Sequence, residues 1–412
     1  MWFHYICLYS PYSMQQKIKK LASKYLEEVV GFRRHLHAHP ELSFQEFETS
    51  KYIAAFLDKQ GIPYQGGFVK TGIVAHIKGR NPDKRIVALR ADMDALPIVE
   101  TNEVSYKSQN EGVMHACGHD VHSSSMMGVA MILNEIKDEF EGTIKIIFQP
   151  GEEILPGGAS LMIKENALKA PDAELIIGQH VYPQLPAGEV GFKKGVYMAS
   201  ADELHVTVKG KGGHAALPHS IVDPILIASH IVVALQQIVS RNCNPVTPSV
   251  LSFGKIEGLG ATNIIPDEVK LAGTFRTFNE EFRADAKIKM KKMAESIAEG
   301  MGGSCEFNIG DGFPFLINDE EVTETCWNSA IEYLGKDKVK ALDLRMTSED
   351  FAYYSHILPS CFYRLGVTEP MGGKEEGLHT STFDIDETAL ETSIGLMSWM
   401  TLNLLATNSN KN

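Results

Sequence analysis

The chain has 412 residues, more than one ordinary domain usually contains, and this length predicts two or three domains. A hydrophobic content of 44% beside a charged content of 22% is typical of a compact globular enzyme and excludes a largely disordered chain. The formal net charge of −13, without a dense run of lysine and arginine, argues against a nucleic-acid-binding surface.

The first residues predict neither a secretory signal nor a membrane anchor. Residues 1–13 are aromatic and apolar but lack a basic n-region and a long apolar h-region. From Ile18 to Leu36 apolar residues recur every three or four positions, which predicts an amphipathic surface helix. No stretch approaches ~18 uninterrupted apolar residues. The cysteines (Cys7, Cys117, Cys243, Cys305, Cys326 and Cys361) lie far apart, which fits reduced thiols. We therefore expect a soluble cytoplasmic protein with no membrane partner.

Short apolar runs alternate with helical patterns in the first half of the chain. The runs lie at 86–89, 144–148 and 175–177, with a helical pattern at 123–136, and this alternation predicts an α/β sheet with much parallel pairing. Each run leads into polar residues: Asp92 and Asp94, then Glu152 and Glu153, then Gln179 and His180. Because ligands of open α/β sheets bind beyond the carboxyl ends of the strands, we expect these groups to converge on one crevice.

The segment His115-Ala116-Cys117-Gly118-His119-Asp120 has the composition of a metal site. Cys117 and His119 can both reach one ion if the backbone between them is irregular, and Gly118 allows such a turn. Short Cys/His runs also arise by chance, so the segment by itself leaves a metal site and an ordinary loop both open.

The pattern changes between about residues 201 and 309. A strand at 204–208 is followed by a helix at 223–239, strands at 250–256 and 269–278, a helix at 280–298 and a strand at 305–309. This βαββαβ order is that of a ferredoxin-like sandwich. Because α/β patterning resumes afterwards and ends in a helix near 387–405, we predict an inserted domain at 199–311, within a domain formed by residues 14–198 and 312–406.

Several charged residues have an ordinary structural explanation as well as a functional one. Glu152 and Glu153 follow a predicted strand, so one can bind metal while the other stays free as a base, or both can be solvated acids. His180 can be a ligand or a partly buried histidine. His37 and His39 lie at a helix end, where cations suit the helix dipole, and are interpreted as structural or site-flanking. The Gly212-Gly213-His214 loop lacks the Lys-Ser/Thr ending of a phosphate loop.

A series of motifs resembles the M20 metallopeptidase and amidohydrolase family, in particular its aminoacylase, hippurate hydrolase and auxin-conjugate hydrolase branch. The motifs begin at Arg33, Arg90, His115, Gln149, Gly178, Gly212, Asn263, Ser348 and Leu378 and span about residues 31–389. The resemblance implies a zinc-peptidase-like catalytic domain, which is a central mixed sheet with flanking helices. It also implies that the inserted ferredoxin-like α+β domain is a lid and dimerisation domain.

The same resemblance implies a site with two divalent metal ions per subunit. The metal ligands would be Cys117, His119, Glu153, His180 and His379, with Cys117 as the candidate bridge and Glu152 as the general base. His214 would donate to the developing oxyanion, and Asn263 and Arg276 would bind the free carboxylate of the substrate. The mixed donors suit Mn²⁺ or Zn²⁺ best and also accommodate Co²⁺ or Ni²⁺.

The leading hypothesis is a metal-dependent amidohydrolase that cleaves N-acyl-L-amino acids carrying an N-acetyl or aromatic acyl group. The resemblance also implies a homodimer or higher homo-oligomer through the inserted domain, with His214 serving the neighbouring subunit. Two alternatives stay open: a dipeptidase or carboxypeptidase of the same family, and a catalytically silent binding protein on this scaffold. The presence of Glu152 and all the proposed ligands argues against the silent protein.

Overall fold

The computed structural model describes residues 11–310, 312–369 and 377–407, so Cys7 and most of the N-terminal segment lie outside the described residues. The chain divides into two compact units. The larger contains Met1–Gly195, Ile317–Asp343 and Tyr353–Asn412, and the smaller contains Val196–Leu316 and Leu344–Ala352. The smaller unit therefore takes in a short segment, residues 344–352, that lies C-terminal to the insertion expected at 199–311. Three short elements lie where the chain passes between the units: β7 (Gly195–Met198), β14 (Leu316–Asn318) and α8 (Ala352–Ser355).

A mixed eight-stranded sheet forms the centre of the larger unit, in the order β1-β2-β4-β3-β5-β16-β6-β15. Its strands are β1 (Tyr64–Phe68), β2 (Gly72–Lys78), β3 (Ile86–Asp92), β4 (Thr143–Gln149), β5 (Leu175–Pro186), β6 (Val190–Phe192), β15 (Val339–Ala341) and β16 (Ser360–Thr368). The inner strands β4, β3, β5 and β16 run parallel to one another. Every residue of β3 and β4 is buried, as expected for strands covered on both faces.

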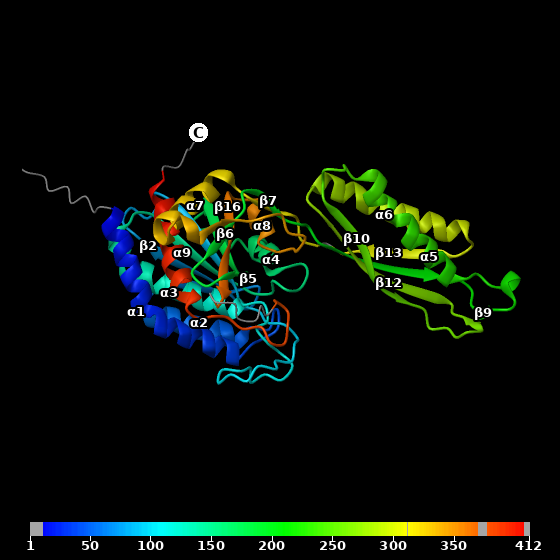
Figure 1. The fold of residues 1–412 in the computed structure, drawn as a ribbon, viewed down its shortest axis with the longest axis horizontal. Coiled ribbons are helices and arrows are strands. Elements are labelled where there is room, and N and C mark those ends of the chain that lie inside the picture. Colours follow the sequence, from blue (N-terminus) through cyan, green and yellow to red (C-terminus); the bar gives the residue numbers. More distant parts are fainter. Residues whose placement is uncertain (1–10, 311, 370–376, 408–412) are drawn as a thin grey trace, which may run out of the picture. The chain divides into compact units, whose positions relative to one another are not determined.

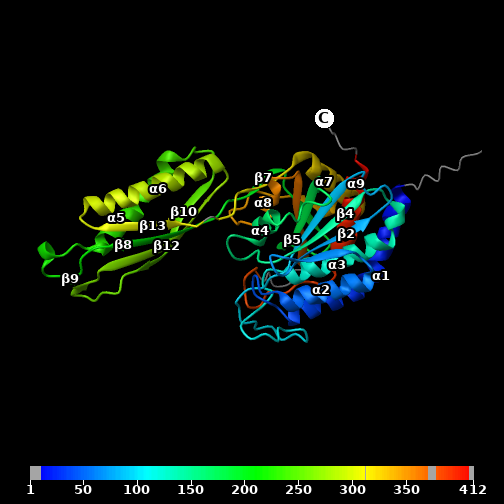
Figure 2. The same cartoon turned by 180° about the vertical axis from the view of Figure 1, so that it is seen from behind.

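Helices flank this sheet, as Figures 1 and 2 show. They are α1 (Pro11–Ala38), α2 (Phe47–Gln60), α3 (His119–Glu135), α4 (Gly158–Lys164), α7 (Glu320–Leu334) and α9 (Ala389–Ala406), with 3-10 turns at Lys137–Glu139 and Lys336–Lys338. α3 packs on β3 and against α1 and α9. Nearly all of α3 is buried, including the polar residues of its first turn. The first turn of α3 is therefore a place where polar side chains are held inside the protein.

The third predicted strand is longer than its apolar run. The run ends at Ile177, but β5 continues to Pro186, so His180 lies inside a strand and not after one. Pairing with β3 covers only the first residues of β5, whereas pairing with β16 extends from Ile176 to Pro186. Backbone hydrogen bonds to β16 therefore keep Gln179 and His180 extended although both are polar.

The smaller unit has the predicted ferredoxin-like arrangement. Its four-stranded sheet has the order β10-β12-β8-β13, and its strands pair antiparallel. The elements are β8 (Asp202–Lys209), β9 (Gly213–His214), α5 (Pro224–Leu235), β10 (Ser249–Glu257), β11 (Ile264–Ile265), β12 (Glu268–Thr277), α6 (Glu280–Gly300) and β13 (Ser304–Ile309), with a 3-10 turn at Pro218–Ser220. α5 and α6 lie side by side on one face of the sheet (Figure 2). This confirms the predicted fold class.

The first helix of the smaller unit begins as predicted and ends earlier. The Asp223 side chain accepts the backbone N–H groups of Ile225 and Leu226, and Pro224 occupies the first turn. α5 ends at Leu235 and is followed by a π-helical turn, Ile238–Asn242. Together, Pro224–Asn242 is long and apolar enough to cross a membrane by length and composition, and 33% of its most apolar stretch is buried. Because one face of α5 packs on the sheet and on α6, this segment is explained as the core helix of the smaller unit.

Candidate metal centre

Side chains from four separate segments of the larger unit converge on one cluster of donor atoms. Cys117 Sγ lies 3.4 Å from His180 Nε2 and 3.3 Å from His379 Nε2. Glu153 Oε1 lies 3.4 Å from His379 Nε2 and 3.8 Å from His119 Nε2. These are all five of the ligands predicted from the sequence, and the fold brings them together although they span residues 117–379.

The donors fall into two sets that share one residue. Cys117, His119 and His180 form one set, and Cys117, Glu153 and His379 form the other; within each set the donor atoms lie within 4.8 Å of one another. A ligand common to two sets is what a bridge between two ions requires. Cys117 is the residue common to these two sets, and its bridging role stays a prediction.

Local backbone geometry presents these donors. Gly118 has φ 84° and precedes the first residue of α3, and a Cβ at Gly118 would lie 2.5 Å from Val181 Cγ2. A side chain at this position would be both strained and crowded. His379 also has a positive φ, 62°, and its N–H donates to the carbonyl of Ala116. Strained non-glycine backbone is concentrated at functional sites. Here the strained residue, His379, also makes the hydrogen bond that joins its loop to the loop of Cys117.

Two histidines are oriented by a hydrogen bond at the ring nitrogen that faces away from the cluster. His119 Nδ1 lies 3.2 Å from Asp94 Oδ1, and His180 Nδ1 lies 2.8 Å from the carbonyl of Val181. In each case the partner can accept the Nδ1 proton, so Nε2 is the nitrogen presented to the cluster, as in carboxylate–histidine–metal arrangements. Sequence reasoning placed Asp94 near the crevice but did not assign it this supporting role.

Asp92, His119 and His122 form a third grouping of possible metal donors. In this grouping the ring nitrogens of His122 are already engaged in hydrogen bonds. His122 Nδ1 lies 2.6 Å from Asp92 Oδ1, and His122 Nε2 accepts the N–H of Val181 at 2.9 Å. Both ring nitrogens are therefore in use. His122 holds Asp92 and the strand β5 in place, a role that no feature of the sequence indicated.

The electrostatics of the cluster fit a bound cation. His119 Nε2 and Glu153 Oε1 are buried without a hydrogen-bond partner, and unpaired buried polar atoms are costly. Burial, with Glu153 and Glu152 nearby, raises the pKa of the Cys117 thiol well above its usual range. Burial alone would lower the pKa of His119, but Asp92 and Asp94 raise it to about 10. A divalent cation would reverse both effects and satisfy the two unpaired atoms.

Glu152 lies beside the cluster at the end of β4. Its carboxylate is within 4.8 Å of donor atoms of His119 and Glu153, and the side chain is buried. Gly151 precedes it with φ 63°, and a Cβ at Gly151 would lie 2.3 Å from the ring of Phe44. Glu153 belongs to the donor set of Cys117 and His379, whereas Glu152 lies outside both sets that share Cys117.

His37 and His39 are placed apart from the donor sets. His37 is buried, with its two ring nitrogens 2.8 Å from Asp120 Oδ2 and 3.2 Å from Glu100 Oε1. Burial opposes its charge, but Asp120 and Glu100 raise the pKa of His37 to about 9. Asp120 is also bound by the buried Arg33 at 2.9 Å, so this network anchors the first turn of α3 to α1.

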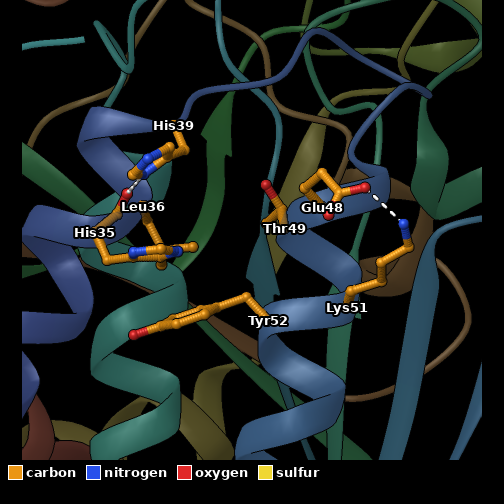
Figure 3. A pocket seen from close by; sticks show the side chains of 7 residues that line it. All are labelled: His35, Leu36, His39, Glu48, Thr49, Lys51 and Tyr52. Atoms are coloured by element: carbon orange, nitrogen blue, oxygen red, sulfur yellow. Dashed lines mark hydrogen bonds and ion pairs between the residues drawn. The ribbon is translucent and has the colours of Figure 1, made fainter. Parts of the chain in front are cut away.

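His39 lies on the surface and lines a cavity of about 420 Å³ between α1 and α2. Figure 3 shows the ring of His35 stacked on Tyr52 in this cavity, with ring centres 4.0 Å apart. None of the predicted ligands lines it.

The other predicted site residues belong to the smaller unit. His214 on β9 pairs with Ile264 on β11, and the N–H of Ala215 donates to the carbonyl of Asn263, so His214 and Asn263 are exposed neighbours at this two-stranded pairing. Arg276 lies near the other end of β12, where its Nη1 donates to the carbonyl of Met346 at 2.9 Å. The smaller unit therefore brings His214 and Asn263 together and keeps Arg276 apart from them.

Comparison with known proteins places this chain in one family. Residues 88–400 match the model of peptidase family M20/M25/M40. An N-acetyl-L-cysteine deacetylase from Bacillus subtilis is 41% identical and covers 88% of this chain and 85% of its own length. Thermostable carboxypeptidase 2 from Saccharolobus solfataricus is 37% identical, covering 91% and 95%. The crystal structure of a dinuclear metal-binding M20 peptidase from Bacillus subtilis has a TM-score of 0.78 at 34% identity, covering 93% and 99%.

The chain is therefore a hydrolase built from a mixed α/β sheet and an inserted ferredoxin-like unit. It belongs to peptidase family M20/M25/M40, which confirms the predicted resemblance. The prediction of a metal-dependent hydrolase acting on amides is confirmed as well.

Proposed function

We propose that this protein hydrolyses the amide bond of N-acyl-L-amino acids, with an N-acetyl or aromatic acyl group, to a carboxylic acid and a free amino acid. The observation that carries the proposal is the buried donor cluster with Glu152 beside it. An amidohydrolase needs an electrophilic centre, an activated water and a base within reach of both. The relative named as a deacetylase of N-acetyl-L-cysteine supports a small acyl amino acid as substrate.

The proposed cofactor is two divalent metal ions per subunit, held by Cys117, His119, Glu153, His180 and His379. A thiolate, imidazoles and a carboxylate together suit Mn²⁺ or Zn²⁺ and also accommodate Co²⁺ or Ni²⁺. When bound, such ions polarise an amide carbonyl and lower the pKa of water. The solved dinuclear relative supports the number of ions.

Glu152 is assigned the proton transfers. Its carboxylate would take a proton from the attacking water and deliver it to the nitrogen of the leaving amino acid, because an amine leaves readily only when it is protonated. Glu152 is buried and its carboxylate lies within 4.8 Å of donor atoms of His119 and Glu153. It is therefore close to the proposed reacting atoms, yet it lies outside both donor sets that share Cys117.

His214, Asn263 and Arg276 are assigned to the substrate. β12 separates Arg276 from the paired strands β9 and β11 by at least eight residues, or about 26 Å at ~3.3 Å per residue. β9 lies beyond the far end of β12 (Figure 1). Because a small acyl amino acid is much shorter, one copy of this unit is not expected to supply both Arg276 and His214 to one substrate. We therefore propose that two copies of this unit contribute to one substrate, with His214 acting on the neighbouring subunit's site.

The surface of the smaller unit supports the homodimer, or higher homo-oligomer, that this assignment needs. Leu226 and Val233 on α5 are 51% and 74% exposed and lie seven residues apart, so they share a face of the helix. β10 is an outer strand of the sheet and carries the 60% exposed Ile256. Exposed apolar residues beside an open strand edge are typical of a protein interface. We propose a cytoplasmic location, without a nucleic-acid or membrane partner.

Turnover of a substrate panel tests the function. The protein is loaded with Mn²⁺ or Zn²⁺ and given N-acetyl amino acids, N-aromatic-acyl amino acids and free dipeptides, and release of the amino acid is measured. We expect the acylated amino acids to be cleaved faster than dipeptides. Preference for dipeptides would favour the carboxypeptidase-like alternative, which the 37% identical carboxypeptidase supports. No turnover with metal bound would favour a silent binding protein.

Substitution of Arg276 by alanine is expected to raise KM for acyl amino acids and to change it little for the corresponding amides, which lack the carboxylate. The guanidinium can form a paired, charge-assisted contact, whose loss costs ~1.5 to 3 kcal/mol. Steady-state kinetics on matched acid and amide substrates measure the difference. Equal effects on both would mean that Arg276 acts only through its bond to Met346.

Substitution of His214 by alanine is expected to lower kcat by ~10² to 10³ while the metal content is unchanged, because an oxyanion donor is lost. Mixing His214→Ala with Glu152→Gln subunits tests whether His214 acts on the neighbouring site. If it does, a mixed dimer has one site with both residues intact and regains activity. Mixed dimers verified by mass spectrometry but still inactive would contradict this assignment.

A further inference from the structure

The segment Ser43–Glu46 contacts both of the turns that carry acidic site residues. The Ser43 hydroxyl donates to Asp94 Oδ2 at 2.6 Å. The same Asp94 carboxylate accepts the N–H of Glu153 at 3.0 Å and orients His119. Ser43 is buried, so this contact lies inside the protein. One carboxylate thus joins the segment to two of the proposed metal ligands.

Glu46 forms the second contact of the segment, with the turn that precedes Glu152. Its Oε1 accepts the N–H of Gly151 at 2.8 Å and the N–H of Phe44 at 2.8 Å, and its Oε2 accepts the hydroxyl of Thr71 at 2.9 Å. Glu46 is fully buried. The ring of Phe44 closes the other side of the left-handed Gly151. The residue immediately before Glu152 is therefore fixed by a hydrogen bond and by packing.

The segment is itself anchored at its start. The carbonyl of Glu41 accepts the N–H of Ala95, and the Glu41 carboxylate accepts the N–H groups of Glu48 and Thr49 in the first turn of α2. Figure 3 shows this turn of α2 opposite His39. Because Glu41 is tied to both a helix start and the residue after Asp94, the segment is a fixed support and not a free loop.

We propose that Glu46 is a positioning residue that holds Gly151, and through it Glu152, in the orientation needed for proton transfer. The proposal rests on the function of Glu152 proposed above. Two independent contacts, Ser43 with Asp94 and Glu46 with Gly151, point to the same role for the segment. A displacement of ~1 Å in a reacting group can cost 10²-fold in rate, so a residue without substrate contact can have a large kinetic effect.

Three substitutions separate this role from a general loss of stability. Glu46→Gln keeps an acceptor for the Gly151 N–H, and its amide can donate to the Thr71 oxygen. Burial and the nearby Asp94 raise the pKa of Glu46 to about 7, so the surroundings disfavour the charged form, and glutamine matches the uncharged form in shape. Glu46→Met keeps the length but has no strong acceptor. Thr71→Val is the matched control, since it removes a hydrogen bond to the same carboxylate without affecting Gly151.

The expected kinetic result is a decrease of kcat by about 10²-fold in Glu46→Met, with KM and metal content near those of the wild type. Glu46→Gln and Thr71→Val should stay within a few-fold of the wild-type kcat. Equal decreases in all three variants, at equal losses of thermal stability, would overturn the proposal. If Glu46→Met does not fold, Glu46→Asp replaces it, because the shorter carboxylate keeps the charge but loses the reach to Gly151.

Hydrogen exchange gives a readout that does not depend on activity. The amide of Gly151 should exchange on the order of ten- to a hundred-fold faster in Glu46→Met than in Glu46→Gln, because methionine offers no strong acceptor for this N–H whereas the glutamine amide oxygen still does. Unchanged protection at Gly151 in Glu46→Met would overturn the proposal even in an inactive enzyme. If the wild type cleaves dipeptides and not acyl amino acids, the proposed function fails while the comparison of the Glu46 variants proceeds on dipeptides.

Discussion

Substitution of Glu152 by glutamine is expected to leave both metal ions bound and to lower kcat by about 10² to 10⁴-fold, the range typical of a lost general acid–base group. Glutamine keeps the size of the side chain but cannot take a proton from water. Because Glu152 lies outside the two donor sets that share Cys117, metal content should not change. Metal analysis and kcat measured on the same preparation check both parts of the expectation.

Glu153→Gln is the matched control for this experiment. It makes the same chemical change one residue along the chain, but Glu153 Oε1 is 3.4 Å from His379 Nε2 and belongs to a donor set. We expect Glu153→Gln to lower metal affinity, and excess metal to restore part of its activity. A Glu152→Gln protein with a near-normal kcat, or one rescued by excess metal, would remove Glu152 from the role of base.

The fold was largely predictable because its main elements have strong periodic patterns. β3 and β4 are buried at every residue, so their apolar runs reveal them directly. β8 alternates between buried and more exposed residues, which is the period of a half-buried strand. β5 was underestimated, because the hydrogen bonds that extend it through His180 come from β16, a strand nearly two hundred residues later. A pairing across that distance leaves no local signal.

Of the candidate site, only the donor residues could be predicted from the sequence. Cys117 and His119 are conspicuous as a pair, and Glu152 and Glu153 follow a strand. His379 is uninformative by itself, since its position depends on a strained backbone and on the bond from its N–H to Ala116. It could be assigned only through the family resemblance. A residue's own neighbours in sequence do not reveal which distant loop it will meet.

The supporting residues were missed for a different physical reason. Ser43 and Glu46 look like ordinary polar residues of a loop before a helix, yet both are buried and bonded to the acidic turns. His122 lies one helical turn after His119 and could pass for another ligand, but both of its nitrogens are in use. Sequence patterns report the type of a side chain, whereas its role depends on which of its atoms remain free.

Substitution of Cys117 by serine is expected to lower metal content and activity together. A neutral hydroxyl is a far poorer anionic ligand than a thiolate. Cys117 is also the one proposed ligand that the two donor sets share, the set with His180 and the set with His379. Loss of a residue that merely supports a ligand typically costs 10- to 100-fold in metal affinity, so loss of a shared ligand should cost about as much or more. Titration with Zn²⁺ or Mn²⁺, followed by metal analysis, measures the change.

Cys243→Ser provides the control, because it makes the same replacement in the smaller unit, where the thiol contacts Ser249 and no donor set. Its metal content and activity should match those of the wild type. If Cys117→Ser loses only one ion, Cys117 is a terminal ligand and a different residue bridges the two. Full occupancy of both ions in Cys117→Ser would exclude Cys117 as a required ligand, because both ions would then bind without the thiolate.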